Sequence, residues 1–265
     1  MRSLLMTSFL IAGVLSTPVN AGEKPPARPI RALLVIGGCC HDYAKQKDIL
    51  TKGISARANV AWTVAYDPDT TTRHLNPVYR TADWAKSFDI IVHDECSSDV
   101  TDKAAVDRIL KPHRQGLPAV VLHCGMHCYR VPRSDEWFKF TGLTTHSHGA
   151  QLPIAVTFVD KKSPITKHLA DWTTIPEELY REEKLWDTAH PLARGKQGKD
   201  DFVVVWTNTY RRKTRVFATT LGHNNETVGD RRYLDLVTNG LLWATGHLTD
   251  QGKPAPGYEA RKSGR

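Results

Sequence analysis

The stretch Arg31-Ala-Leu-Leu-Val-Ile-Gly-Gly-Cys-Cys-His41 has the composition of a buried strand that ends in a glycine turn and a histidine. Two later apolar runs also end in a histidine: residues 118–122 precede His123, and residues 215–222 precede His223. If these runs are parallel strands of one sheet, their carboxyl ends lie at the edge where open α/β folds form a binding crevice. The sequence therefore predicts that three histidines far apart in the chain share one site.

Strands and helices are predicted to alternate through the first half of the chain. The strands are expected at residues 31–36, 60–66, 88–92 and 119–122. The helices are expected at residues 42–56, with Asp42 as the N-cap, and at residues 101–114, capped by Thr101. This alternation is typical of βαβ units and predicts an α/β fold with a mostly parallel central sheet.

The second half is expected to add three strands and one helix. Residues 152–159 are predicted as an edge strand, because Pro153 cannot donate a hydrogen bond to a neighbouring strand. Residues 201–207 and 215–221 are predicted to pair as a hairpin. A final helix is expected over residues 231–245, with Gly246 as its stop.

The ends of the chain differ in composition from the middle. Residues 1–21 resemble a secretory signal peptide, with Arg2, a short apolar run and small residues before Ala21. A Pro-rich leader (22–30) and a flexible basic tail (249–265) are expected to flank one domain over residues 31–248. No apolar stretch is long enough to span a bilayer, so we expect an exported periplasmic or extracellular protein without stable membrane insertion after signal cleavage.

The chain carries a formal net charge of +8 at pH 7. Its basic residues are spread over loops and the tail, and they form no stripe with interleaved aromatic residues. The pattern excludes a nucleic-acid binder and favours a solvated basic surface. A homo-oligomer stays an open alternative, because the sequence does not fix the oligomeric state.

Five cysteines make an odd set, and most fall at or just beyond predicted strand ends. Adjacent Cys39 and Cys40 are expected to be poorly placed to bridge each other. The spacings match no zinc ribbon or knuckle, and the disulfide connectivity cannot be derived from them.

Residues 119–127 predict a strand, a sharp turn and a helix, the local geometry that presents a nucleophile in hydrolases and amidotransferases. Cys124 is the candidate nucleophile, with His223 as base and Glu226 as the residue that orients it. Whether His123 or Cys124 lies at the tip of the turn is left open by the spacing. A small buried cysteine without chemistry is the alternative interpretation.

A divalent metal such as zinc or manganese is the second interpretation of the histidines. Neutral imidazole is the commonest metal ligand near pH 7, so His41, His123 and His223 with a carboxylate would make an open metal site. The carboxylates considered are Glu177, Glu178, Asp94 and Glu95. His146 and His148 are two positions apart, which allows them to chelate a metal or to be a simple loop pair.

Four tryptophans could stack on a sugar ring or pack in the core: Trp84, Trp137, Trp186 and Trp206.

The same stretches, taken together and in order, resemble the ThuA-like (trehalose utilisation) family of the class I glutamine amidotransferase-like superfamily. The resemblance rests on His41, on Val121-Leu-His-Cys124, on 163–166 followed by Pro176-Glu-Glu-Leu-Tyr180, and on 215–226 with the closing segment 239–244. It runs from about residue 31 to residue 246.

The resemblance implies a flavodoxin-like three-layer sandwich and a role in carbohydrate metabolism, with a pocket formed by the histidines and Glu178. It also implies that His123, and not a cysteine, occupies the nucleophile position of the superfamily. The spacing of His223 and Glu226 departs from the His-x-Glu pattern of glutaminases. Amidotransferase chemistry is therefore not expected.

The preferred hypothesis is an exported enzyme that hydrolyses or isomerises a small carbohydrate, a sugar or an oxidised glycoside, with the help of a metal. The alternatives are a cysteine hydrolase or amidase that uses Cys124 and a non-catalytic carbohydrate-binding protein. The candidate residues fall into three groups: catalytic His123, Glu178, His223 and Glu226; substrate-binding Asp42, Cys124, His127, Arg130 and Tyr180; and metal-binding His41, His123 and His223.

Overall fold

The parallel half of the central sheet holds the three strands that precede the histidines. The computed structural model describes residues 27–131 and 134–261, so the predicted signal peptide and most of the leader lie outside the described residues. Within these residues the parallel strands run side by side in the order β2-β1-β3-β4-β11. Their bounds are Val60–Asp67 (β2), Ile30–Gly38 (β1), Ile90–Cys96 (β3), Ala119–Leu122 (β4) and Thr214–Thr219 (β11).

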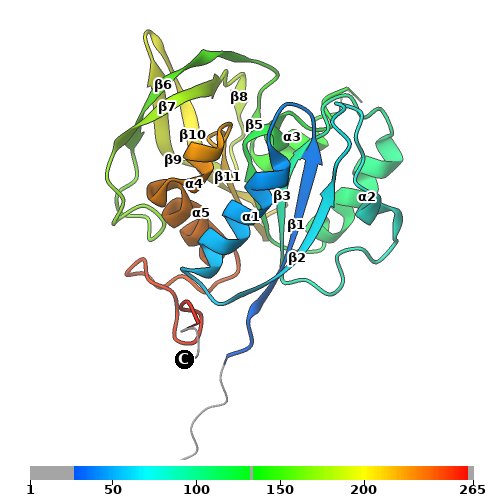
Figure 1. The fold of residues 1–265 in the computed structure, drawn as a ribbon, viewed down its shortest axis with the longest axis horizontal. Helices are drawn as coiled ribbons and strands as arrows, with labels where there is room; N and C mark the ends of the chain where they lie inside the picture. Colours follow the sequence, from blue (N-terminus) through cyan, green and yellow to red (C-terminus); the bar gives the residue numbers. More distant parts are fainter. Residues whose placement is uncertain (1–26, 132–133, 262–265) are drawn as a thin grey trace, which may run out of the picture.

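The sheet continues beyond β11 with antiparallel strands (Figure 1). In order they are β10 (Asp200–Tyr210), β9 (Ala189–Gln197), β6 (His148–Phe158) and β7 (Trp172–Tyr180). The predicted hairpin is confirmed, because β10 pairs antiparallel with β11. The predicted edge strand is wrong: β6 lies between β9 and β7, and Pro153 is tolerated where the pairing with β7 becomes irregular.

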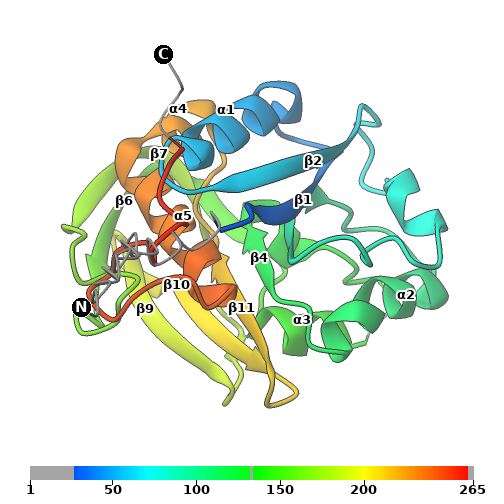
Figure 2. The same ribbon diagram turned by 90° about the horizontal axis from the view of Figure 1, so that it is seen from below.

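Helices cover both faces of the parallel half and make the three layers predicted for a flavodoxin-like α/β fold (Figure 2). One face packs against α1 (Tyr43–Ser55) and α5 (Arg231–Ala244), and the other against α2 (Lys103–Arg114) and α3 (Glu136–Thr141). Because both faces are covered, the central strands are nearly continuous apolar runs. Short elements complete the chain: η1 (Pro77–Arg80), η2 (His123–His127), β5 (Leu143–Thr144), β8 (Lys184–Leu185) and α4 (Asn225–Gly229).

The helix ends agree with the sequence prediction except at one cap. Asp42 caps α1 by accepting a hydrogen bond from the backbone N–H of Lys45. Thr101 was expected to cap α2, but Asp102 does so and accepts from the backbone of two residues in the first turn. A carboxylate there also faces the positive end of the helix dipole.

The third strand extends further than its apolar run suggested. β3 was expected to end at Val92, yet it pairs with β1 as far as Cys96. Asp94 and Glu95 therefore lie inside the strand and are buried. Glu95 is satisfied by the hydroxyls of Tyr79 and Tyr129, which donate to it at 2.7 and 3.1 Å.

The segment predicted as a tail packs against the fold over its described part. Leu248 and Ala58 form isolated bridges with Pro254 and Glu259. The ring of Tyr258 stacks on His247 at a centroid distance of 3.6 Å.

Within the described residues, every helix is too short or too polar to traverse a bilayer.

Candidate functional site

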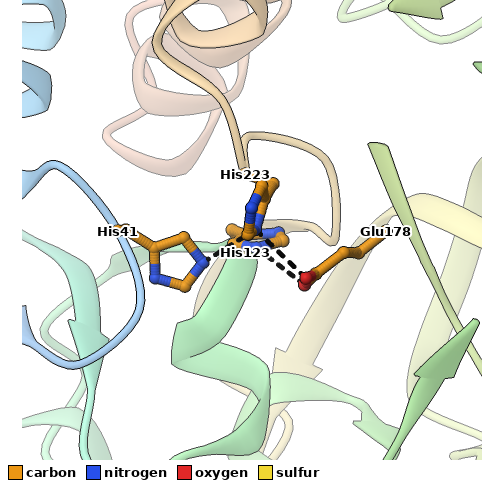
Figure 3. Close-up of side chains that lie close together, drawn as sticks. All are labelled: His41, His123, Glu178 and His223. Carbon is orange, nitrogen blue, oxygen red and sulfur yellow. Dashed lines mark hydrogen bonds and ion pairs between the residues drawn. The ribbon is translucent and has the colours of Figure 1, made fainter. Parts of the chain in front are cut away.

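Three loops at the carboxyl edge of the parallel strands carry the predicted histidines. His41 follows β1, His123 follows β4 and His223 follows β11. The ring of His41 lies 4.7 Å from that of His123 and 4.8 Å from that of His223, measured between centroids. The structure thus brings the three imidazoles together, as the strand ends predicted (Figure 3).

Glu178 supplies a carboxylate to the same cluster. Its oxygens lie 3.3 Å from Nδ1 of His223 and 3.5 Å from Nε2 of His123. Although β7 is the outermost strand of the sheet, Glu178 reaches the ends of the central strands, so the antiparallel half must bend back over that edge. One ligand atom from each of the four residues fits within a mutual distance of 4.8 Å. We call His41, His123, Glu178 and His223 the tetrad.

Backbone carbonyls fix the orientation of two of the imidazoles. Nδ1 of His41 donates to the carbonyl of Cys39 at 3.1 Å, and Nδ1 of His123 donates to that of Thr220 at 2.7 Å. These bonds turn Nε2 of each ring toward the centre of the tetrad. His223 turns Nδ1 inward instead, and its Nε2 lies 2.9 Å from the side-chain amide of Gln151.

His123 occupies the tip of the turn after β4. Its φ of 40° is in the left-handed region, which a non-glycine residue adopts only at a cost. The short η2 turn, and not a full helix, follows it. The alternative left open by the sequence is thereby decided in favour of His123, and a sharp strand-to-turn geometry of this kind holds a side chain above the end of the sheet.

The charges of the tetrad are set by burial and by its own members. Burial, together with the neighbouring His123 and His223, lowers the pKa of His41 to about 2, so this imidazole stays neutral. Burial would raise the pKa of Glu178, but the hydrogen bonds and charges of His123 and His223 outweigh it and hold the pKa far below the ordinary value. The hydrogen bond to Glu178 in turn raises the pKa of His223.

A cavity of about 410 Å³ opens beside the tetrad and borders His41 and Glu178. The predicted substrate-binding residues Cys124, His127, Arg130 and Tyr180 line it. The ring of His127 stacks on Tyr180 at 4.0 Å between centroids. Burial, with the nearby Arg130, holds the pKa of His127 well below its ordinary value, so this imidazole is uncharged. None of the tryptophans considered for stacking lines this cavity within the described residues.

Two predicted site residues are not brought to the tetrad. Glu226 lies exposed on α4, and Asp42 is occupied as the cap of α1 and as acceptor for the side chain of Asn225 at 2.9 Å. Asp94 and Glu95 are also excluded, because they are buried within β3, where burial and Glu95 raise the pKa of Asp94 to about 8. The proton-transfer role predicted for Glu226 therefore has no geometric basis.

The cysteines correct two expectations. Cys39 and Cys40 do form a disulfide, because the backbone turns at Cys40 with a φ of 80° after two glycines that also have positive φ. Cys124 is bonded to Cys96, so in this form of the chain it offers no free thiol to a cysteine hydrolase mechanism. Cys128 is the remaining thiol of the described residues and is buried.

Sequence reasoning missed two residues that support the tetrad. Gln151 faces Glu178 across the β6–β7 pair, and the sequence does not reveal this contact because it predicts no strand over residues 172–180. Gln46 donates to the backbone carbonyl of His223 at 3.0 Å. The signal for Gln46 was present: it lies on the buried stripe of α1 with Tyr43, Leu50 and Ile54.

The fold and the site define an α/β protein of flavodoxin-like architecture that carries a histidine at the sharp turn after β4. The model of the ThuA family, described as trehalose utilisation, matches residues 31–244, and the chain belongs to this family. The resemblance drawn from the sequence and the predicted fold class are both confirmed. Membership associates the chain with carbohydrate metabolism.

Solved structures show the same fold at low sequence identity. A ThuA-like protein from Parabacteroides merdae is 19% identical with a TM-score of 0.65, over 88% of this chain and 98% of that chain. A second, from Bacteroides uniformis, is 17% identical with a TM-score of 0.63, over 86% and 95%. A GMP synthase component from Thermoplasma acidophilum is 9% identical with a TM-score of 0.51, over 82% and 94%. A search of curated proteins found no match.

Proposed function

We propose that the chain is an enzyme of carbohydrate metabolism that acts on a sugar or an oxidised glycoside by metal-assisted hydrolysis or isomerisation at the tetrad. The observation that carries this proposal is the approach of four ligand atoms, from three imidazoles and one carboxylate, to within 4.8 Å beside the cavity. The family description, trehalose utilisation, supports a carbohydrate as the substrate.

The donor set fits a divalent ion of the zinc or manganese type. Imidazole nitrogen and carboxylate oxygen are the ligands that such ions take, and the backbone hydrogen bonds at Nδ1 turn Nε2 of His41 and of His123 toward the centre of the tetrad. Four protein ligands would fill a tetrahedral zinc site, whereas a six-coordinate ion such as Mn²⁺ keeps positions for substrate. When bound, the ion would polarise a sugar oxygen or acidify a water molecule.

His148 is the residue that we assign to proton transfer in place of Glu226. Its Nδ1 donates to the carbonyl of Gly149 at 2.8 Å, and its Nε2 lies 3.6 Å from the carboxylate of Glu178. The side chain is 41% exposed and lines the cavity, so it can exchange protons with both substrate and solvent. Glu178 is held as an anion by the histidines and is the poorer base.

The activity test uses purified protein with added Mn²⁺ or Zn²⁺ and a panel of disaccharides and their keto derivatives, followed by NMR. We expect product with at least one substrate and a loss of about 100-fold or more in kcat in His148→Gln. His190→Gln is the matched control, because His190 is exposed and bonds only Asp160 on the surface. Binding of a sugar, seen as a rise in Tm, without turnover under any metal would replace the proposal by a non-catalytic carbohydrate-binding protein.

We also propose that the chain is exported. Disulfides persist in oxidising compartments and are rare in the cytosol, so the two disulfides beside the tetrad support the predicted signal peptide. Secretion of a full-length fusion to a reporter active only outside the cytoplasm tests this. An inactive reporter on the full-length chain would contradict export, and activity that does not depend on residues 1–21 would contradict the predicted signal peptide. The homo-oligomer stays a prediction.

A further inference from the structure

Four sulfur atoms form a continuous row along the edge that carries the tetrad. Cys39 and Cys40 are bonded to each other directly after β1, and Cys96, the last residue of β3, is bonded to Cys124 just after β4. The two disulfides touch, because Sγ of Cys39 lies 3.4 Å from Sγ of Cys96. Neighbouring strands β1, β3 and β4 therefore hold the sulfurs in the order 40, 39, 96 and 124.

The row is open to solvent at one end only. Cys40 is exposed, whereas Cys39, Cys96 and Cys124 are 8%, 3% and 6% exposed. All four line the cavity described above. A thiol that approaches from solution therefore meets Cys40 first. When it bonds to Cys40, the sulfur of Cys39 is released as a thiolate next to the buried disulfide.

We propose that these four cysteines are a thiol–disulfide exchange site whose reductant is an external dithiol. A thiolate of the dithiol bonds to Cys40, the Cys39–Cys40 bond breaks, and Cys39 leaves as a thiolate. Cys39 then bonds to Cys96, the Cys96–Cys124 bond breaks, and Cys124 takes up a proton. The second thiol of the dithiol displaces Cys40, which also becomes a thiol.

The net reaction transfers two electrons from the dithiol to the protein. The dithiol loses two electrons and two protons and becomes a disulfide, while the protein ends with a Cys39–Cys96 disulfide and thiols at Cys40 and Cys124. The exchange requires neither a metal nor a sugar, so it stands apart from the proposed function. It nevertheless alters the residues next to His41 and His123, two members of the tetrad.

Cys128 provides an internal reference outside the row. Its Sγ donates to the carbonyl of Glu95 at 3.0 Å and accepts from the backbone N–H of Ser97 at 3.2 Å. Its contact with Cys124 is to the backbone carbonyl and not to the sulfur. We therefore expect Cys128 to keep its thiol, and its slow alkylation, throughout the exchange.

The test treats the full chain, purified without reductant, with one equivalent of dithiothreitol and blocks the thiols that line the cavity with N-ethylmaleimide. Peptide mapping by mass spectrometry without reduction then locates label and cross-links. We expect label at Cys40 and Cys124 and a Cys39–Cys96 cross-link. Label at Cys39 and Cys40 with the Cys96–Cys124 bond retained would overturn the proposal, as would the absence of any reaction before unfolding.

A pair of variants tests the contact between the two disulfides without any reductant. In Cys124→Ser, Cys96 becomes a thiol beside Cys39 and can displace Cys40, so we expect maleimide label at exposed Cys40. In Cys96→Ser the row is interrupted, and label is expected at Cys124 alone. Absence of label at Cys40 in Cys124→Ser, while the variant keeps the wild-type circular dichroism spectrum, contradicts the exchange.

Discussion

Adjacent glutamates on β7 serve the site in different ways. Glu178 joins the tetrad, whereas the carboxylate of Glu177 accepts hydrogen bonds from the backbone N–H groups of His223 and Asn224 at 3.0 and 3.2 Å. Glu177 thus fixes the loop that carries one imidazole and is a positioning residue. Partners of this kind hold ligands in the orientation that a metal needs.

Replacing Glu177 by glutamine tests this positioning role. The amide keeps one acceptor but presents N–H groups to a second donor, so the loop of His223 loses a hydrogen bond. We expect Kd for Mn²⁺ or Zn²⁺ to rise by about tenfold or more, as measured by calorimetry. Glu183→Gln is the control, because Glu183 is exposed and bonds His146 outside the tetrad. Equal affinities for both variants would rule out the role.

The metal affinity should also depend on pH through His223. Glu178 raises the pKa of His223, so a proton on this ring competes with the ion, whereas the pKa of His41, about 2, removes it from the competition. Affinity is then constant above the pKa of His223 and falls by about tenfold per pH unit below it, because one proton is displaced. Calorimetry between pH 8 and pH 5, about the range in which histidines titrate, measures the slope. A slope of zero would show that no ring proton is displaced.

At the scale of elements, α5 packs closely on β11, the strand that leads to His223. A Cβ added at Gly240 would lie 2.3 to 2.6 Å from atoms of the Phe217 ring, which is fully buried. Glycine is therefore required here by the close approach of the helix to the sheet.

Gly240→Ala should lower the free energy of unfolding by about 1–3 kcal/mol, since the helix must move away from Phe217. Denaturant unfolding of the metal-free protein measures the change. Gly229→Ala is the matched control in α4, where the added Cβ would meet only Ile49 at an ordinary 3.7 Å. A Gly240→Ala variant as stable as this control would contradict the packing argument.

The elements that could be predicted were those with local signals. The strand from Arg31, the helix capped by Asp42 and the final helix after Arg231 follow from apolar periodicity and caps. The extension of β3 to Cys96 could not be predicted, because its polar residues are satisfied by partners distant in sequence. The inner position of β6 was missed because Pro153 was expected to disrupt regular pairing, whereas the β6–β7 pairing is irregular at this residue and tolerates a proline.

At the scale of the whole molecule, the site depends on how the two halves of the sheet meet. The parallel half supplies His41, His123 and His223 from the carboxyl ends of β1, β4 and β11, and this convergence followed from the sequence. Glu178 was one of four carboxylates considered from the sequence, and only the family resemblance singled it out, since a position on an edge strand gives no local hint that it returns to the centre. The disulfide pairing could not be predicted from the sequence either, because it depends on strand order and on the turn at Cys40.

The most direct test is anomalous diffraction from a crystal of the full chain grown with Mn²⁺ or Zn²⁺, recorded at the absorption edge of the metal. The account predicts one strong peak bounded by Nε2 of His41, Nε2 of His123, Nδ1 of His223 and the carboxylate of Glu178. A crystal with ordered side chains at the tetrad and no peak among them, or with the metal bound elsewhere, would contradict the central claim.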